Sequence, residues 1–221
     1  MTRKLEFTTR APQSGTTKSM VVFLHGYGAN GADLMGLADP LGPQLPDTVF
    51  VAPDAPDKIP GAPFGFQWFP IPWIDGSTEE AAGEGLLKAS ADLNAFLDEQ
   101  LKEHSVKPEN CIILGFSQGT MLALHVAVRR DEAVAGVVAF SGRLLVPERL
   151  EEEAVSKPPV ILIHGDQDDV VPPQSLPEAG DALSVAGFEV YAHVMEGTGH
   201  GIAPDGLTAA NHFMRQKLGY T

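Results

Sequence analysis

Hydrophobic and polar positions follow two different patterns along the chain. Short runs of apolar and β-branched residues, such as MVVFLH at 20–25 and CIILG at 111–115, are apolar almost throughout. This pattern is typical of strands that are buried on both faces of a sheet. We therefore predict strands at 20–25, 48–52, 111–115, 134–141, 159–164 and 188–195, with an edge strand at 5–8.

Longer segments between these runs have helical spacing. In residues 79–104, for example, Leu86, Leu93, Phe96 and Leu97 fall close to one face of a helix. Strands that alternate with helices indicate an α/β fold, with a mostly parallel central sheet and helices on both faces. A length of 221 residues suits a single domain over 1–221. We predict helices at 31–41, 79–104, 118–130, 173–186 and 205–218.

Residues 56–76 fit neither the strand pattern nor the helical pattern. The segment is rich in proline, glycine and aromatic residues, and it holds both tryptophans of the chain. A long loop in a compact domain is usually functional or disordered, and the aromatic content argues against disorder. It either lines an apolar substrate groove or packs as a small cluster on the sheet edge. The groove interpretation uses the side chains of Phe64, Phe66, Trp68, Phe69 and Trp73.

Charge and composition narrow the class of partners. Fifteen basic residues against 29 acidic ones give a formal net charge of −14. Such a surface repels phosphate backbones and anionic membranes, so we expect neither nucleic-acid binding nor stable membrane anchoring. The first residues, MTRKLEFTTRAP, lack the apolar core of a secretory signal, and the single cysteine fits a reducing compartment. We expect a cytoplasmic protein.

The motif with the clearest chemistry is G-x-S-x-G at 115–119, which is Gly-Phe-Ser-Gln-Gly. It follows the apolar run at 111–115 and precedes a helical pattern, which is the strand–turn–helix setting of a nucleophile elbow. Glycines keep Cβ atoms out of such a strained turn. We therefore predict that Ser117 is a nucleophile above the edge of the sheet.

A serine hydroxyl needs a general base, and in this fold the chain order is serine, acid, histidine. His193 lies in a strand pattern and His212 in the last helix, whereas His200 lies in a glycine-rich loop directly after the last strand. His200 is the predicted base. We expect activity to fall as the pH drops through about 6.5, the ordinary range of a histidine.

The orienting acid should follow the preceding strand, at 159–164. Asp166, Asp168 and Asp169 all lie in the next few residues, and their spacing does not choose between them. The aspartates without this role are expected to cap a helix or bind loop amides.

Donors for an oxyanion come from two backbone amides. One is the N–H of Gln118, directly after the nucleophile. The other should come from the loop after an early strand, where the segment His-Gly-Tyr-Gly at 25–28 makes the N–H of Tyr27 the predicted donor. The same glycines also suit a plain tight turn.

Several reactive side chains are interpreted as structural. His25 and His164 end predicted strands before a glycine, His125 lies on an apolar helix, and Cys111 begins a strand. No histidine, cysteine and carboxylate cluster has zinc spacing, and neither a P-loop nor a G-x-G-x-x-G motif is present, so we expect no metal and no cofactor.

Four segments together resemble the phospholipase/carboxylesterase family of α/β-hydrolases, which includes acyl-protein thioesterases: FLHGYGAN, GFSQGTMLAL, HGDQDDVVP and GTGHGI. The family motif H-G-x-x-D-x-V-V-P selects Asp168 as the acid, and its oxyanion loop matches Tyr27, where many members carry leucine. The resemblance covers nearly the whole chain and allows a homodimer.

The resemblance implies a serine carboxylesterase, without cofactors, that hydrolyses short- to medium-chain acyl esters through an acyl-enzyme. Thioesters and lysophospholipids are the alternative small-molecule substrates within the family. An α/β-hydrolase scaffold that binds a ligand without turnover is a further alternative, although such proteins usually lose a member of the triad.

Overall fold

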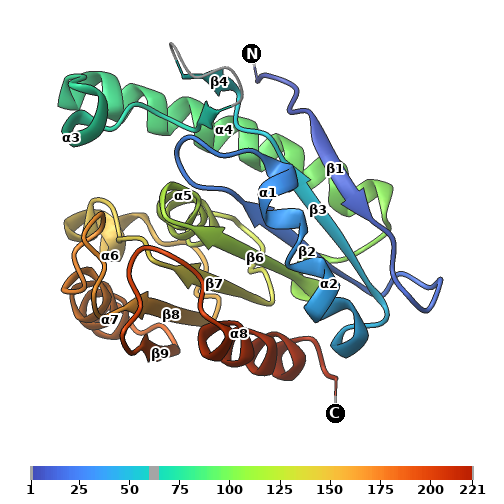
Figure 1. The fold of residues 1–221 in the computed structure, drawn as a ribbon. Coiled ribbons are helices and arrows are strands. Elements are labelled where there is room, and N and C mark those ends of the chain that lie inside the picture. The colour runs from blue at the N-terminus through green and yellow to red at the C-terminus, as the bar shows by residue number, and fades with distance from the viewer. Residues whose placement is uncertain (1, 60–64, 221) are drawn as a thin grey trace.

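The central sheet positions everything else in the protein. The computed structural model describes residues 2–59 and 65–220, and its main sheet has seven strands in the order β1-β3-β2-β6-β7-β8-β9 (Figure 1). Only β1 is antiparallel to its neighbour, so the predicted mostly parallel sheet is confirmed. The strands are β1 Phe7–Arg10, β2 Ser19–Leu24, β3 Thr48–Pro53, β6 Cys111–Phe116, β7 Gly136–Phe140, β8 Val160–Gly165 and β9 Val190–Met195.

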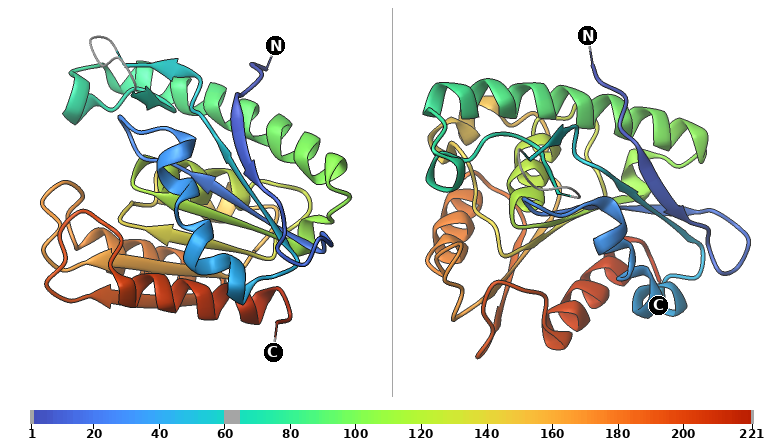
Figure 2. Two further views of the ribbon diagram at one scale, coloured as in Figure 1. Left: turned by 45° about the vertical axis from the view of Figure 1, so that its right-hand side comes forward. Right: turned by 45° about the horizontal axis from the view of Figure 1, so that its top comes forward.

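Helices cover both faces of this sheet, as Figure 2 shows from two sides. Alternate residues of β2 enter different cores: Val22 packs with the helices of one face, and Phe23 packs with those of the other. The first layer holds α4 Glu79–Glu103, α5 Gln118–Ala127, α6 Leu150–Glu153 and α7 Ser175–Val185. The second holds α1 Gly31–Met35, α2 Ala38–Leu41 and α8 Pro204–Lys217.

The register of the two central strands brings two distant loops together. β2 and β6 are parallel, and Leu24 lies opposite Gly115. The residues that follow these two positions therefore leave the sheet side by side at its carboxyl edge. Ligands of open α/β sheets bind at this edge.

The predicted helix at 31–41 is wrong as a single element. The chain forms α1, which ends before Gly36, and then a separate α2. Asn30 and Asp33 begin α1 with a capping box. Pro40 explains the break, because it has no N–H to donate and its ring would clash with the carbonyl of the residue four positions earlier, Gly36.

Residues 56–76 contain more regular structure than the sequence suggested. A two-stranded antiparallel hairpin joins β4 Asp57–Lys58 to β5 Phe66–Gln67, and α3 Pro72–Asp75 follows. Phe64, one of the predicted groove residues, lies outside the described residues. The segment rests against the beginning of α4, where a Cβ on Gly85 would lie 2.5 Å from Pro70 Cδ.

Candidate active site

Ser117 lies in a sharp turn between β6 and α5. Its backbone is left-handed, with φ 53° and ψ −114°, a conformation that costs energy for a residue with a Cβ. The N–H of Ser117 donates to the carbonyl of Phe140 at 2.9 Å, which ties the turn to the neighbouring strand β7. The structure therefore places Ser117 where a nucleophile elbow would hold it.

The two glycines of the motif are required by close backbone approach. A Cβ on Gly115 would lie 2.4 Å from the nitrogen of Thr120, and a Cβ on Gly119 would lie 1.9 Å from the oxygen of Leu24. Neither gap admits a carbon atom, so α5 can pack this tightly on β6 and β2 only with glycine at both positions.

The predicted oxyanion donors flank Ser117. A Cβ on Gly26 would lie 3.3 Å from Ser117 Cβ, so the loop that carries Tyr27 passes directly beside the nucleophile. The N–H of Tyr27 donates to no protein group within the described residues. Gln118 is the first residue of α5, and the first amides of a helix have no partner within the helix. Both N–H groups are therefore available to a developing negative charge.

The side chain of Gln118 has a separate task that the sequence did not reveal. Its Oε1 accepts the Trp68 N–H at 3.0 Å, and its Nε2 donates to the Phe69 carbonyl at 2.6 Å. Trp68 Nε1 in turn donates to the carbonyl of His25 at 2.9 Å. These bonds fasten the aromatic segment to both loops of the predicted oxyanion site.

This anchoring corrects the groove prediction for two residues. Trp68 is 0% exposed and Phe69 is 3% exposed, and both belong to the hydrophobic core, so neither offers surface to a groove. The alternative interpretation, a cluster packed on the sheet, holds for this pair. Phe66 is partly buried against the same core. Trp73 is 53% exposed, and its ring lies 5.5 Å from the Arg143 guanidinium, so it stays a candidate for the edge of a groove.

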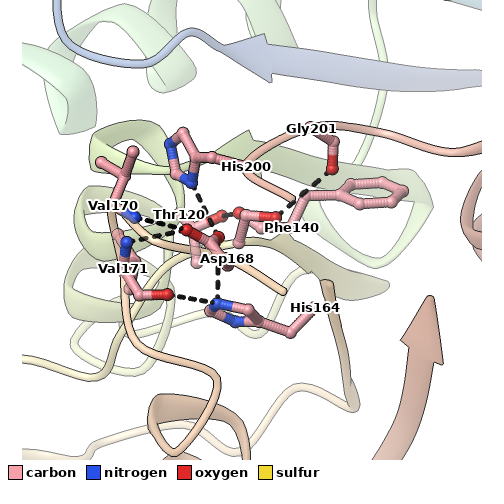
Figure 3. A network of polar contacts seen from close by, with 9 residues as sticks. Thr120, Phe140, His164, Asp168, Val170, Val171, His200 and Gly201 are labelled. Atoms are coloured by element: carbon pink, nitrogen blue, oxygen red, sulfur yellow. Dashed lines mark hydrogen bonds and ion pairs between the residues drawn. The ribbon is translucent and has the colours of Figure 1, made fainter. Parts of the chain in front are cut away.

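The structure brings His200 and Asp168 together and separates the other two aspartates. His200 Nδ1 lies 2.8 Å from Asp168 Oδ2, while Oδ1 accepts the N–H groups of Val170 and Val171 at 2.9 Å each (Figure 3). Asp166 accepts a loop N–H, from Gly197 at 2.7 Å, as expected for an aspartate without the acid role.

The carboxyl of Asp168 is stabilised in its charged form. Burial alone would raise its pKa, but the hydrogen bonds from His200, Val171 and Val170 outweigh burial and hold the pKa below its ordinary value. A charged acceptor fixes the proton of His200 on Nδ1 and leaves Nε2 free to accept a proton. This is the tautomer that a general base needs.

His200 also lies beside the nucleophile loop. Its ring packs against the ring of Phe116, the residue before Ser117, with centroids 4.9 Å apart and the two planes tilted by 46°. The next residue, Gly201, accepts a hydrogen bond from Ser141 Oγ at 3.4 Å. Among the described residues, Ser117 Oγ and His200 share no hydrogen bond. Catalytic contacts of this kind are often long before substrate binds and tighten with it.

The remaining candidates from the sequence have other environments. His25 Nδ1 lies 2.8 Å from the Gly26 carbonyl, and its Nε2 accepts the Ala55 N–H, so both ring nitrogens are occupied. Burial lowers the pKa of His125 to about 4 and raises the pKa of the Cys111 thiol to about 12. A thiol that stays protonated at neutral pH is a poor nucleophile.

His164, interpreted from the sequence as structural, lies beside the predicted acid. It is buried, and its Nε2 lies 3.2 Å from Asp168 Oδ2. The spacing of four residues between His164 and Asp168, across the end of β8, was the available signal in the sequence.

Within residues 2–59 and 65–220, no three histidine, cysteine or acidic side chains are grouped to hold a metal ion. No helix in that part of the chain is long and apolar enough to span a membrane, and the cytoplasmic location stays a prediction.

Ser117 has a positive φ in a turn between a parallel strand and a helix, and a histidine–aspartate pair lies on later loops of the same sheet edge. This arrangement defines the class of α/β-hydrolases. Comparisons with known proteins agree with this class. A family model described as phospholipase/carboxylesterase matches residues 8–218. The chain therefore belongs to the phospholipase/carboxylesterase family, and it is a hydrolase.

Individual relatives cover nearly the whole chain. Acyl-protein thioesterase 1 of Saccharomyces cerevisiae is 30% identical over 215 residues, which is 91% of this chain and 93% of that protein. The crystal structure of esterase PE8 is similar to this chain, with a TM-score of 0.92 and 42% sequence identity. The match covers 98% of this chain and 100% of that one. The crystal structure of acyl-protein thioesterase 2 of Zea mays matches with a TM-score of 0.78 and 26% sequence identity. This match covers 97% of this chain and 99% of that one.

Proposed function

We propose that the protein is a serine carboxylesterase that hydrolyses short- to medium-chain acyl esters through an acyl-enzyme on Ser117. The observation that carries this proposal is the pairing of His200 Nδ1 with Asp168 Oδ2 at 2.8 Å, on the sheet edge where Ser117 stands in its left-handed turn. Each group has the local environment that its role requires.

In the proposed reaction, Ser117 Oγ attacks the ester carbonyl carbon while His200 Nε2 takes its proton. The negative charge on the former carbonyl oxygen is stabilised by the N–H groups of Tyr27 and Gln118. The carbonyl re-forms when the bond to the leaving alcohol breaks, and His200 gives that alcohol the proton. Water, deprotonated by the same histidine, then attacks the acyl carbon. The bond to Ser117 Oγ breaks, His200 returns the proton to Oγ, and the acid is released, while Asp168 keeps the imidazole oriented.

The test is a series of p-nitrophenyl esters of increasing acyl length, with Ser117→Ala as the blank. We expect kcat/KM to peak at short to medium chains and the variant to lose this activity. Stoichiometric labelling of the wild-type protein, and not of Ser117→Ala, by a fluorophosphonate would support the nucleophile independently of the substrate. Rates equal to the blank at every length, together with no labelling, would argue for a ligand-binding scaffold.

A second candidate is thioester hydrolysis, because the relatives that match nearly the full chain include proteins named acyl-protein thioesterases. The triad would be shared, so the groove decides the preference. Matched oxygen esters and thioesters of the same acyl group separate the two candidates. A thioester kcat/KM that exceeds the oxygen ester's by more than the leaving groups explain would favour the thioesterase, and the same comparison with lysophospholipids tests the remaining family activity.

A further inference from the structure

Asp168 Oδ2 is shared by two histidines. His164, at the end of β8, is buried, and its Nε2 lies 2.9 Å from the Val171 carbonyl and 3.2 Å from Asp168 Oδ2. Both neighbours are hydrogen-bond acceptors, so Nε2 must carry a proton to face them. Figure 3 shows His164 on one side of the Asp168 carboxylate and His200 on the other.

With this contact, both oxygens of the carboxylate have protein N–H groups against them. Oδ1 accepts the N–H groups of Val170 and Val171, and Oδ2 lies 2.8 Å from His200 Nδ1. The N–H edge of His164, whose hydrogen bond goes to the Val171 carbonyl, lies 3.2 Å from the same Oδ2. The Asp168 side chain is completely buried, so water cannot substitute for a missing donor at low cost. Each donor therefore affects both the position of the carboxylate and the charge it presents to the base.

We propose that His164 is a positioning residue of the catalytic machinery, which acts on His200 through the shared oxygen of Asp168. The inference rests on the proposed function of the Ser117, His200 and Asp168 set. The N–H edge of His164, 3.2 Å away, keeps Oδ2 at the position where His200 Nδ1 meets it. It also takes up part of the negative charge that would otherwise stabilise a protonated His200.

Other charged groups of the two loops point elsewhere or into solvent. Asp166 binds the N–H of Gly197, and Asp169 is exposed, as is Glu196 on the loop that carries His200. Among the described residues, the hydrogen bonds and ion pairs of His164 go to Val171 and Asp168 alone. A change of His164 should therefore reach the base through Asp168.

The experiment compares His164→Leu, which removes the donor, with His164→Gln, whose amide nitrogen reaches about the same place as the imidazole Nε2. For His164→Leu we expect kcat on a p-nitrophenyl ester to fall about tenfold with KM within about twofold, since the group acts on the transition state. The acid limb of the kcat/KM profile should move to higher pH by roughly half a unit, because Asp168 then holds more charge for His200. His164→Gln should restore both values most of the way.

A matched control is His125→Gln, since His125 is also buried but lies on α5 without a contact to Asp168. It should leave the acid limb in place. Fluorophosphonate labelling and thermal unfolding of each variant show whether it is folded. If His164 only holds its loop through the Val171 carbonyl, His164→Leu will lower stability while the acid limb stays where it is, and that result would overturn the inference.

A double-mutant cycle gives the sharper result. In an Asp168→Asn background, His164→Leu should lower kcat by less than about twofold, because the route from His164 to the base is already removed. An undiminished tenfold loss in that background would contradict the inference. Failure of the proposed function looks different, because wild-type protein would then be no more active than Ser117→Ala, whatever residue stands at position 164.

Discussion

The loops on the two sides of the active site are held in place by different interactions. The nucleophile side, from β2 and β6, is held by backbone packing: Gly115 and Gly119 have no room for a Cβ, and Gln118 fastens the neighbouring aromatic segment. The acid–base side, from β8 and β9, is held by hydrogen bonds around one buried carboxylate, Asp168. Gly165 at the end of β8 is also closely packed, 2.2 Å from the Thr198 carbonyl oxygen if it carried a Cβ, but the loop that holds His200 is open, and a Cβ on Gly201 would meet nothing within 4 Å.

This difference matches what each side must do. The nucleophile and the oxyanion donors have to keep fixed positions, and close-packed backbone supplies a steric limit that no change of pH removes. The base has to change its protonation state in every cycle, and its His200 side chain is 17% exposed. Hydrogen bonds around the Asp168 carboxylate can persist when the base gains or loses a proton, but their strength depends on the charge of the groups that they join. The two sides should therefore fail in different ways when they are perturbed.

The largest expected effect comes from adding one methyl group on the nucleophile side. In Gly119→Ala, the Cβ would lie 1.9 Å from the oxygen of Leu24, so either α5 or the end of β2 must move. We expect a loss of more than about 4 kcal/mol in the free energy of unfolding and no measurable esterase activity. Chemical denaturation and p-nitrophenyl ester hydrolysis measure the two losses.

The matched control lies on the other side of the site. Gly201→Ala adds the same methyl group next to the proposed base, where the space is open and φ does not require glycine. We expect the free energy of unfolding to stay within about 0.5 kcal/mol of wild type, as for most substitutions in open positions. If the two alanine variants were equally destabilised, the steric contrast between the turn at Ser117 and the loop of His200 would be wrong.

The next largest effect removes charge from the acid–base side. In Asp168→Asn, the amide can still accept the N–H groups of Val170 and Val171, but its NH₂ group then faces His200 Nδ1. The imidazole would turn to the tautomer with its proton on Nε2, which cannot deprotonate Ser117. We expect kcat to fall about 10³–10⁴-fold while KM changes little. A decrease of less than tenfold would show that Asp168 is not the orienting acid.

The sequence predicted the strands and the backbone of this site well, for a local reason. Strand runs such as 111–115 are apolar on both faces, and a glycine-flanked serine after such a run has one structural solution, so Ser117 could be placed without a structure. The choice among three aspartates needed a resemblance to a family, because adjacent loop positions differ by side-chain direction, which spacing does not encode. In the structure, Asp168 bonds to His200 whereas Asp166 bonds to Gly197.

The aromatic segment was harder to predict because its contacts are long-range. Trp68 and Phe69 have the composition of an apolar groove, yet they are buried because the side chain of Gln118 binds their backbone from about 50 residues away. Hydrophobicity alone does not distinguish an aromatic ring that meets substrate from one that packs in the core. Trp73, five residues further on, is exposed.

A smaller effect tests that anchor. In Gln118→Met, the side chain keeps its length but leaves the Trp68 N–H and the Phe69 carbonyl unpaired in the interior. We expect a loss of about 2–4 kcal/mol in the free energy of unfolding, from two buried polar groups without partners. Since the backbone N–H at position 118 remains, kcat should stay within about fivefold of wild type. A loss of kcat as large as that of Asp168→Asn would show that the Gln118 side chain also takes part in the chemistry.

The smallest expected effect is on acid stability, and it separates the two sides by charge. The pKa of Asp168 lies below its ordinary value because hydrogen bonds outweigh the opposing effect of burial. A carboxyl of this kind stabilises the folded state above its unfolded pKa of about 4, and the contribution is lost as the pH falls through the lower, folded value. Denaturation curves between pH 3 and 7 should therefore fall less steeply toward acid in Asp168→Asn than in wild type. Gln118→Met should keep the wild-type steepness, because it removes an anchor that carries no charge. If the stability of Asp168→Asn fell with pH in parallel with that of wild type, the charge of Asp168 would not stabilise the acid–base side. The two sides would then differ only in how closely their backbones pack.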